Sequence, residues 1–428
     1  MLTWIVVHSE TLCKFLIPLL VDFTPAQHRH ALNFIEALLV CPAKHKTLAA
    51  LTRLLRLPHA DEYALADFFR VSPWSNQPVR QAVTRFLLHT VSHIQARTGW
   101  RLLFLSVDDA LCRKDAETQA LQAVAWHYDH VTVRRQKGQY TNASHYVTVH
   151  LQLGPAQFAL TWRLYLKRDQ VKRLNRQRRT QGLPVLTFQT LPELVEAMLR
   201  EIAPELPRGC RVYVLFDSWF DGHRLETFIR AQGWHWICAT RSNRNLSGRP
   251  LASWWNHLAY QRILRWTVRS ATRQHTYLTR HLVGRLRRYP APVVAIISKW
   301  DRGDRYPRYF LCSDPNLGVR TILKYYRFRW ECELDNWFLK ERFGLADYRL
   351  QPLAAILAWH TLVFAAYAFV QYRRVLPLLT DPKATLAPLG EVLSDHRQWH
   401  AQQTVRAIAA RARQGYSDDQ IAAEFFPT

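Results

Sequence analysis

Two apolar runs that each end in aspartate constrain the fold of this chain more than any other feature. Residues 102–107 (LLFLSV) lead into Asp108 and Asp109, and residues 211–216 (RVYVLF) lead into Asp217. Continuous apolar runs of this length are typical of strands that are buried on both faces, between layers of helices. The two runs therefore predict an α/β domain in which two buried strands deliver carboxylates at their ends.

Further strand and helix patterns surround these runs. Residues 146–153 and 158–166 are predicted to be two strands joined by a Gly-Pro turn, and residues 234–239 are predicted to be a strand that follows Asp217. An amphipathic pattern over residues 194–202 predicts a helix between the two acid-bearing strands. Three strands in meander order, the first of them carrying an acid, are typical of a ribonuclease-H-like domain.

The segment 325–340 (YYRFRWECELDNWFLK) supplies a third acid. It has no Gly or Pro and carries charges at helical spacing, which predicts a helix. One face of this helix would carry a cation, a carboxylate and an aromatic ring: Arg329, Glu333 and Trp337. A carboxylate among arginine, tyrosine and lysine suits a helix that offers a metal an oxygen ligand and binds phosphate beside it. A salt-bridged surface helix is the alternative interpretation.

The chain is strongly basic. Its formal net charge is +25 and its isoelectric point is near 10.2, while 48% of its 428 residues are hydrophobic, which excludes general disorder. A charge of this size predicts a polyanionic partner. Nucleic acid is favoured over an anionic membrane, because the basic residues are accompanied by sixteen tryptophans that can stack on bases. The seven cysteines include no CxxC pair, which indicates neither a zinc site nor a disulfide framework and fits a reducing cytoplasm.

The densest basic run lies at residues 167–179 (KRDQVKRLNRQRR) and contains a single acid. Charge runs are often solvated helix faces. In a chain with so large a positive excess, phosphate binding is the favoured interpretation. The candidate DNA contacts in this run are Lys172, Arg173 and Arg176.

A second basic region contains no Asp or Glu between residues 227 and 300. Arginines and aromatic residues alternate there, and residues 263–270 and 275–283 are predicted to be strands. This composition suits a β-rich surface that grips a nucleic-acid strand, with a passive basic insertion as the alternative. The aromatic candidates for DNA contact are Trp254, Trp255 and Trp266.

Both ends of the chain are predicted to be helical. Thr24 to Gln27 form a capping-box pattern within the first 95 residues. The short N-terminal helices with basic flanks suit either a DNA-binding helix-turn-helix or a small bundle that packs on the next domain. From residue 376 onward a linker and two short helices are predicted.

The apolar stretch 353–371 is long enough to span a membrane. As a span it would stand alone, directly after a charged helix. As a buried helix that closes the sheet of an α/β domain it needs no further assumption. We therefore interpret it as a core helix and expect no membrane association.

Asp108, Asp217 and Glu333 together suit phosphodiester chemistry with two divalent metal ions. One ion activates the attacking oxygen and the other stabilises the leaving oxygen. Mg²⁺ prefers hard oxygen ligands and needs few carboxylates, and we expect Mn²⁺ to substitute for it. Arg329 and Lys340 could hold a terminal phosphate, and Tyr326 could stack or donate a hydrogen bond.

The spacing of the third segment is also that of a known signature. Two residues separate Tyr326 from Arg329, three separate Arg329 from Glu333, and six separate Glu333 from Lys340. This spacing is that of the Tyr-Arg-Glu-Lys pattern of bacterial insertion-sequence DDE transposases of the "IS-four" type, which the chain resembles. The resemblance implies that Asp217 is the second acid and Glu333 the third. In that family the first acid is usually followed, after one residue, by Thr or Ser. Here Asp108 and Asp109 precede Ala110, so the hydroxyl is missing. Asp108 is preferred as the first acid, because it leaves the apolar run first, and Asp109 is the alternative.

The resemblance implies a domain order. A helical DNA-binding domain (1–95) would precede a ribonuclease-H-like catalytic core (96–240 and 316–375), which a basic β-rich insertion (241–315) interrupts, and a helical tail (376–428) would follow. The implied reaction is metal-dependent cleavage of double-stranded DNA at the terminal inverted repeats of an element. The freed 3′-OH would then attack target DNA.

The family commonly forms a hairpin intermediate and works as a homodimer on DNA, which would place this protein in the bacterial cytoplasm with the nucleoid. The resemblance also implies that an aromatic residue of the insertion stabilises a flipped base. Two other functions remain open: a metal-dependent nuclease that does not join strands, and a non-catalytic DNA-binding protein derived from a transposase.

Overall fold

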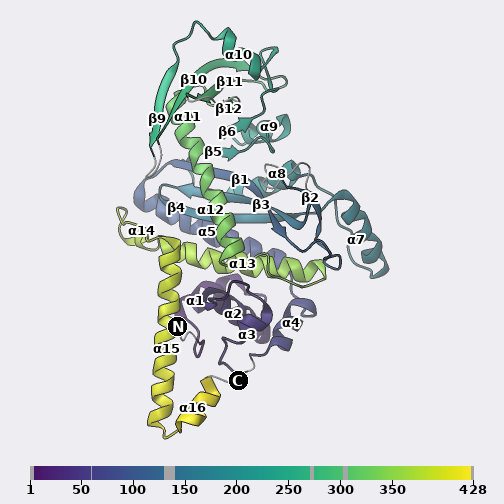
Figure 1. Ribbon diagram of the computed structural model, residues 1–428, viewed down its shortest axis with the longest axis vertical. Coiled ribbons are helices and arrows are strands. Elements are labelled where there is room, and N and C mark those ends of the chain that lie inside the picture. The colour runs from purple at the N-terminus through teal and green to yellow at the C-terminus, as the bar shows by residue number, and fades with distance from the viewer. Residues whose placement is uncertain (1–3, 59, 130–139, 270–273, 302–306, 426–428) are drawn as a thin grey trace.

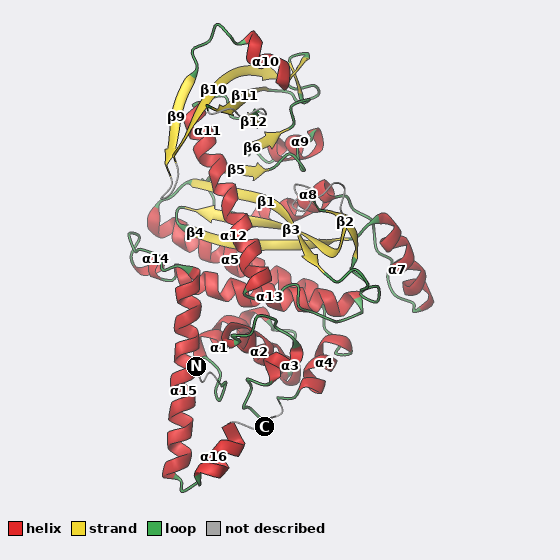
Figure 2. Ribbon diagram, viewed as in Figure 1, coloured by secondary structure: helices red, strands yellow, loops and turns green. Residues whose placement is uncertain are grey.

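The computed structural model describes residues 4–58, 60–129, 140–269, 274–301 and 307–425. A large mixed β-sheet occupies one part of the molecule, with helices on both of its faces, and a group of helices lies beyond the long helix α13 (Figure 1). Figure 2 shows that the strands gather on one side of α13 and that only helices and loops lie on the other.

The main sheet has ten strands in the order β2-β3-β1-β5-β6-β12-β11-β10-β9, with β4 also paired to β3. A separate two-stranded ribbon, β7 with β8, lies outside it. The bounds of the strands are β1 Leu102–Arg113, β2 Ala125–Tyr128, β3 Tyr140–Leu153, β4 Ala156–Tyr165, β5 Arg211–Phe216, β6 His235–Thr240, β7 Asn245–Leu246, β8 Arg249–Pro250, β9 Leu264–Arg269, β10 Gln274–Arg285, β11 Pro292–Trp300 and β12 Arg308–Cys312.

The strand directions in the first half of the sheet are mixed. β1 pairs antiparallel with β3, which pairs antiparallel with β4. On its other side β1 pairs parallel with β5, and β5 pairs parallel with β6. A meander followed by parallel strands, with helices on both faces, is compatible with the ribonuclease-H-like fold expected from the sequence.

The basic strands continue the same sheet. β12 pairs antiparallel with β6, and β11, β10 and β9 follow in turn. Residues 241–315 are the predicted basic β-rich insertion. In the structure they supply β12, the strand that covers the edge of β6, whose backbone N–H and C=O groups would otherwise be unpaired.

The first acid-bearing strand is longer than predicted. We expected it to end at Val107, but β1 continues through both aspartates to Arg113, because β3 pairs with it along this whole length. Its parallel neighbour β5 is shorter, and the last pair between them joins Ser106 to Leu215. Asp108 therefore lies inside an antiparallel pair, just beyond the end of the parallel one.

Helices cover both faces of the strands. α8 packs on β3 and β4, and α9 packs on β6. On the other face the even-numbered side chains of β1 meet α11, a 3₁₀ turn and α12, with Phe104 against the rings of Tyr325 and Phe328. The bounds of the helices outside the N-terminal region are α7 Arg168–Thr180, α8 Leu191–Ile202, α9 His223–Ala231, α10 Leu251–His257, α11 Val319–Tyr326, α12 Trp330–Glu341, α13 Leu353–Val375, α14 Pro377–Thr380, α15 Leu389–Arg413 and α16 Asp418–Phe425.

The N-terminal helices pack onto α13. α2, α4 and α5 all contact α13, and α5 also contacts β4. The predicted capping box is present, since the Thr24 hydroxyl accepts from the Gln27 N–H (3.3 Å) and the Gln27 side chain accepts from the Thr24 N–H (2.9 Å). The bounds of these helices are α1 Glu10–Leu16, α2 Pro25–Val40, α3 Leu48–Thr52, α4 Glu62–Arg70 and α5 Asn76–Thr98.

The apolar stretch near residue 360 forms α13. It is long and apolar enough to cross a membrane, yet 89% of its most apolar window is buried inside the protein. The sheet strand β4 lies on one side of it, and α2, α4, α5 and α15 lie on others. The prediction of two short C-terminal helices is wrong for the first of them, because α15 has 25 residues and packs along α2 and α13.

Trp359 on α13 should be essential for joining the N-terminal helices to the sheet. Its ring is 1% exposed, lies 4.8 Å from the Phe34 ring and 5.7 Å from the Phe69 ring, and its indole N–H donates to the Gly344 carbonyl. We expect Trp359→Ala to lower the free energy of unfolding by about 3–5 kcal/mol, because a large cavity remains. Denaturant unfolding followed by tryptophan fluorescence and circular dichroism measures this loss.

The control is Val405→Ala, at a position that is 59% exposed, which should change the free energy of unfolding by less than about 0.5 kcal/mol. Equal stability of the two variants would contradict the packing described.

Candidate active site

A single arginine joins two of the predicted acids. Arg329 donates from Nη1 to Asp108 Oδ1 (3.1 Å) and from Nη2 to Glu333 Oε1 (2.5 Å). The other oxygen of Asp108 accepts from the Nδ2 amide of Asn336 (3.0 Å). Two residues of one helical segment, Arg329 and Asn336, thus hold the carboxylate that β1 brings to the face of the sheet, and Arg329 joins it to Glu333.

The helical segment is not one continuous α-helix. α11 ends at Tyr326, a 3₁₀ turn covers Arg327–Arg329, and α12 begins at Trp330. The prediction of a helix over residues 325–340 is therefore right about its helical character and wrong about its continuity. Within it, Arg329, Glu333 and Asn336 follow at spacings of four and three residues, so they share the face that meets β1.

Asp217 follows directly after β5. Its Oδ1 accepts from the N–H of Trp219 (2.8 Å), and its carbonyl accepts from the N–H of Phe220 (3.2 Å), so a tight turn fixes the carboxylate. Burial raises the pKa of Asp217, and the nearby charge of Arg329 opposes this shift. The second predicted acid therefore lies within electrostatic reach of the arginine that joins the other two.

The site holds more negative charge than Arg329 neutralises. Burial, together with the charges of Asp109 and Asp217, raises the pKa of Asp108 to about 7 in spite of the guanidinium beside it. Burial alone would lower the pKa of Arg329, but its anionic neighbours, with Asp108 and Glu333 among them, outweigh burial and raise it. The arrangement favours additional positive charge at the carboxylates.

Asp109, the alternative first acid, points away from this group. Successive side chains of a strand lie on opposite faces. The Asp109 carboxylate meets His145 on β3, with 2.6 Å between Oδ2 and Nε2. The structure therefore brings Asp108, and not Asp109, to Arg329 and Glu333.

The remaining residues of the Tyr-Arg-Glu-Lys pattern lie along the same segment. The ring of Tyr326 packs against Phe310 with 5.0 Å between ring centroids, and the Arg329 guanidinium lies 6.0 Å from its centre. Lys340 is half-buried near the end of β1, where burial raises the pKa of the Cys112 thiol to about 11 and the Lys340 charge opposes that shift.

The three candidate tryptophans are partly buried and already have partners. Trp254 donates to the Leu246 carbonyl (3.2 Å), and Trp266 donates to the Thr279 hydroxyl (3.0 Å). The ring of Trp255 lies under two cations, with the Arg280 guanidinium at 4.5 Å and the Lys299 ammonium at 4.3 Å from its centroid. The structure does not bring these rings to the acids through any described contact.

The basic run forms α7, which projects from the side of the sheet (Figure 1). Its buried residues are Gln170, Val171 and Leu174, which face the protein. The predicted DNA contacts Lys172, Arg173 and Arg176 are all exposed. An exposed basic helix face with one nearby acid, Asp169, can bind phosphates.

A buried polar network holds α12 in place. Asp335, which is 5% exposed, accepts from His150 Nδ1 on β3 (2.7 Å) through one oxygen. Its other oxygen accepts from the Tyr367 hydroxyl (2.5 Å) and the Gln371 amide (3.2 Å) on α13. His150 Nε2 lies 2.8 Å from the hydroxyl of Thr148, which itself donates to the Asp108 carbonyl. The helix that carries Glu333 is thus tied to the sheet and to α13 together.

Several features of the site were absent from the sequence-based prediction. Asp335 and Asn336 follow Glu333 closely in the sequence. An amide or a second acid on a charged helix is common, so nothing in the sequence marks these two residues as part of a site. Two exposed aromatic residues next to the acids in sequence were not proposed as DNA contacts: Trp219 (41% exposed) and Trp330 (60% exposed). Both are close in sequence to an acid of the site, and this proximity is the signal that could have identified them.

The acids fit a divalent cation by their chemistry. Carboxylates from β1, from the turn after β5 and from α12 are the hard oxygen donors that Mg²⁺ prefers. Burial is the main reason that the pKa of Asp108 is raised, and a bound cation would stabilise the ionised form of this carboxyl. Asp108, Asp217 and Glu333 would hold the ion, which when bound activates an attacking oxygen and stabilises a leaving oxygen.

Comparison with known families supports this interpretation. A family model described as "DDE superfamily endonuclease" matches residues 18–288, which is well over half of the chain. The chain belongs to the DDE superfamily endonucleases. The match includes Asp108 and Asp217 and ends before Glu333, so the third acid rests on the contacts described above. Comparison with curated protein sequences found no match.

This membership establishes the general activity. The protein is an enzyme of a family that acts on phosphodiester bonds, its substrate is DNA, and the family generally uses divalent metal ions. Asp108 lies on a strand of a mixed sheet that is compatible with that family's fold, and Arg329 links it to Glu333 on α12.

The buried carboxylate of Asp335 should be required for the position of α12. We expect Asp335→Ala to lower the free energy of unfolding by about 3–5 kcal/mol, because it leaves His150 and Tyr367 buried without their partner. Tyr367→Phe removes one hydrogen bond and should cost only about 1 kcal/mol. Thermal and denaturant unfolding of both variants test this order. An Asp335→Ala variant as stable as the wild type would show that the network does not anchor the helix.

Proposed function

We propose that the protein is a cut-and-paste DNA transposase of the insertion-sequence "IS-four" type. It would cleave DNA at the terminal inverted repeats of its element and join the freed 3′-OH to target DNA. The observation that carries the proposal is the contact of Arg329 with both Asp108 and Glu333, which joins the core strand to the Tyr-Arg-Glu-Lys segment. Arginine, carboxylate and lysine on one helical segment suit phosphate and metal together.

Each residue of the site has a proposed role. Asp108, Asp217 and Glu333 hold Mg²⁺, with Mn²⁺ as a substitute, and Asn336 keeps the Asp108 carboxylate oriented through its amide. Arg329 and Lys340 bind the phosphate beside the cleaved bond. Tyr326, packed between Phe310 and the arginine, fixes the guanidinium on the side of the acids.

Two basic regions would bind the flanking duplex. The exposed face of α7 contacts phosphates, and the acid-free strands β9 to β11 run along a second stretch of DNA. The candidates for contact with a flipped base are the three tryptophans of the insertion: Trp254, Trp255 and Trp266. The protein acts as a homodimer on paired DNA ends in the cytoplasm, with residues 1–95 as a further DNA-binding part.

The three acids should be required for chemistry and not for DNA binding. We expect Asp108→Asn, Asp217→Asn and Glu333→Gln each to reduce cleavage at least about 10²-fold, because each removes a metal ligand, while the affinity for DNA stays within a few-fold. The assay uses a duplex that carries the DNA flanking the gene, with Mg²⁺ or Mn²⁺, and follows nicking and strand transfer on gels.

Two neighbouring carboxylates provide matched controls. Asp109→Asn changes the adjacent residue on the opposite face of β1, and Glu331→Gln changes an acid two residues earlier on α12; both should retain most of the cleavage. If Asp109→Asn abolishes cleavage and Asp108→Asn does not, the assignment of the first acid is wrong. Cleavage without joined products would favour the nuclease that does not transfer strands. DNA binding by the wild type without cleavage in either metal would favour the non-catalytic protein.

The α7 face should contribute salt-dependent affinity. Replacing Lys172, Arg173 and Arg176 together by Gln removes three phosphate contacts, so the slope of log affinity against log salt should fall in magnitude by about 2–3. Fluorescence anisotropy with a labelled duplex at several salt concentrations measures the slope. An unchanged slope in the triple variant would exclude α7 from the DNA interface.

A further inference from the structure

A buried cluster of one carboxylate and two imidazoles lies apart from the candidate active site. Glu36 comes from α2, and His396 and His400 come from α15. Figure 1 shows both helices on the side of α13 that faces away from the sheet. The side chains of the three residues are 0%, 3% and 0% exposed.

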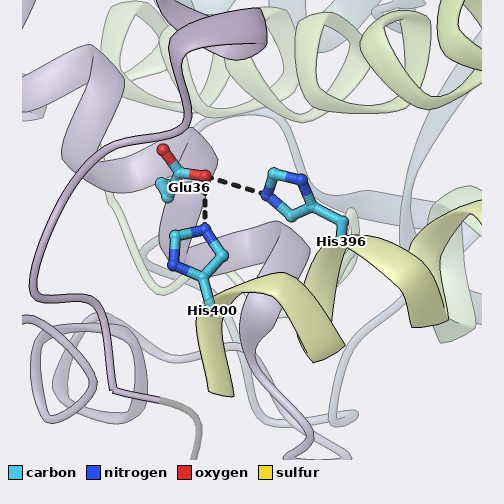
Figure 3. Close-up of side chains that lie close together, drawn as sticks. All are labelled: Glu36, His396 and His400. Atoms are coloured by element: carbon cyan, nitrogen blue, oxygen red, sulfur yellow. Dashed lines mark hydrogen bonds and ion pairs between the residues drawn. The ribbon is translucent and has the colours of Figure 1, made fainter. Parts of the chain in front are cut away.

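The three side chains converge on one point. Nε2 of His396 and Nε2 of His400 each lie 2.8 Å from the same oxygen of Glu36, Oε1. All three ligand atoms lie within 4.8 Å of one another. Figure 3 shows both imidazole rings with one nitrogen, Nε2, directed toward the carboxylate. Residues four apart on a helix share a face, which explains how α15 presents both imidazoles together.

The second oxygen of Glu36 is held separately. Oε2 accepts from the backbone N–H of Ser9 (3.0 Å) and lies 3.2 Å from Nδ1 of His8. Contacts of this kind fix the orientation of a metal ligand. Apolar rings enclose the imidazoles, with Phe369 5.7 Å from His396 and Trp399 4.7 Å from His400 between ring centroids. The cluster is thus an oriented ligand set inside a largely apolar contact between helices.

We propose that Glu36, His396 and His400 bind one zinc ion that joins α2 to α15. Two imidazoles and one carboxylate are a ligand set that zinc uses in proteins, with bonds of about 2.0–2.2 Å. Ligand atoms on a tetrahedral zinc lie about 3.3 Å apart, so the 2.8 Å contacts of the cluster need to open by only about 0.5 Å. Mg²⁺ prefers oxygen ligands alone, so the two metals select different sites in this protein.

Zinc in this position has a structural consequence. The ion would cross-link a helix near the start of the chain to one near its end, through three buried side chains. The inference is independent of the proposed transposase activity, because none of the three residues contacts an acid of the candidate active site in the described structure.

The experiment measures zinc in the purified full-length protein. After dialysis into metal-free buffer, elemental analysis should find about one zinc per chain, and a chelator should lower the melting temperature by about 3 °C or more, reversibly on addition of ZnCl₂. Glu36→Gln should lose the zinc, although its amide oxygen can still accept hydrogen bonds from both imidazoles. His396→Gln/His400→Gln should lose it as well.

Two controls separate this site from other metal binding. His89→Gln/His93→Gln removes an exposed pair of histidines with the same four-residue spacing on α5, 4.4 Å apart between ring centroids, and should keep the zinc. Asp108→Asn should also keep it, and loss of zinc there would place the ion at the candidate active site and overturn the inference. Where a variant fails to fold, the wild-type measurements decide. A wild type that retains no zinc and melts at the same temperature with chelator or ZnCl₂ would show that the cluster is a hydrogen-bonded network only.

Discussion

The burial of α13 is the constraint on which the rest of the structure depends. This helix is apolar on nearly every side, so it must be covered by protein all round. The sheet covers one side through β4, and α2, α4, α5 and α15 cover others. The N-terminal and C-terminal helices are therefore not appendages but parts of the same hydrophobic core as the acid-bearing strand.

Contacts with this core determine the geometry of the candidate active site. Tyr367 and Gln371 on α13 bind Asp335, and Asp335 lies on α12, the helix that carries Glu333. The strand β1 supplies Asp108 from the opposite direction, and Arg329 joins the two acids. Neighbouring carboxylates repel one another when no counter-ion is present. The Arg329 guanidinium reduces this repulsion, and the acids remain available to a cation.

Local patterns predicted the parts of this architecture that local physics determines. The apolar runs before Asp108 and Asp217 are strands, the Thr24 capping box starts a helix, and residues 325–340 are helical, because each depends on near neighbours in the sequence. The pairing of β12 with β6 could not be predicted, since it depends on which strand covers an open edge. The length of β1 was missed for a related reason: β3 keeps two aspartates inside a strand that their own propensity would end. Asn336 and the Glu36 cluster join residues distant in sequence, and nothing in their local surroundings distinguishes them.

The unbroken strand pairing from β1 to β10 also fixes the distance between these two strands. Strands in a sheet repeat at about 4.8 Å, so the five steps from β1 through β5, β6, β12 and β11 to β10 separate the acid-bearing strand from β10, in the acid-free part of the chain, by about 24 Å along the sheet. Duplex DNA rises about 3.4 Å per base pair, so this separation corresponds to about seven base pairs. A hinged insertion could adjust that distance, but a hydrogen-bonded sheet resists stretching. The sheet would therefore keep a fixed distance between the acids and any duplex bound at β10.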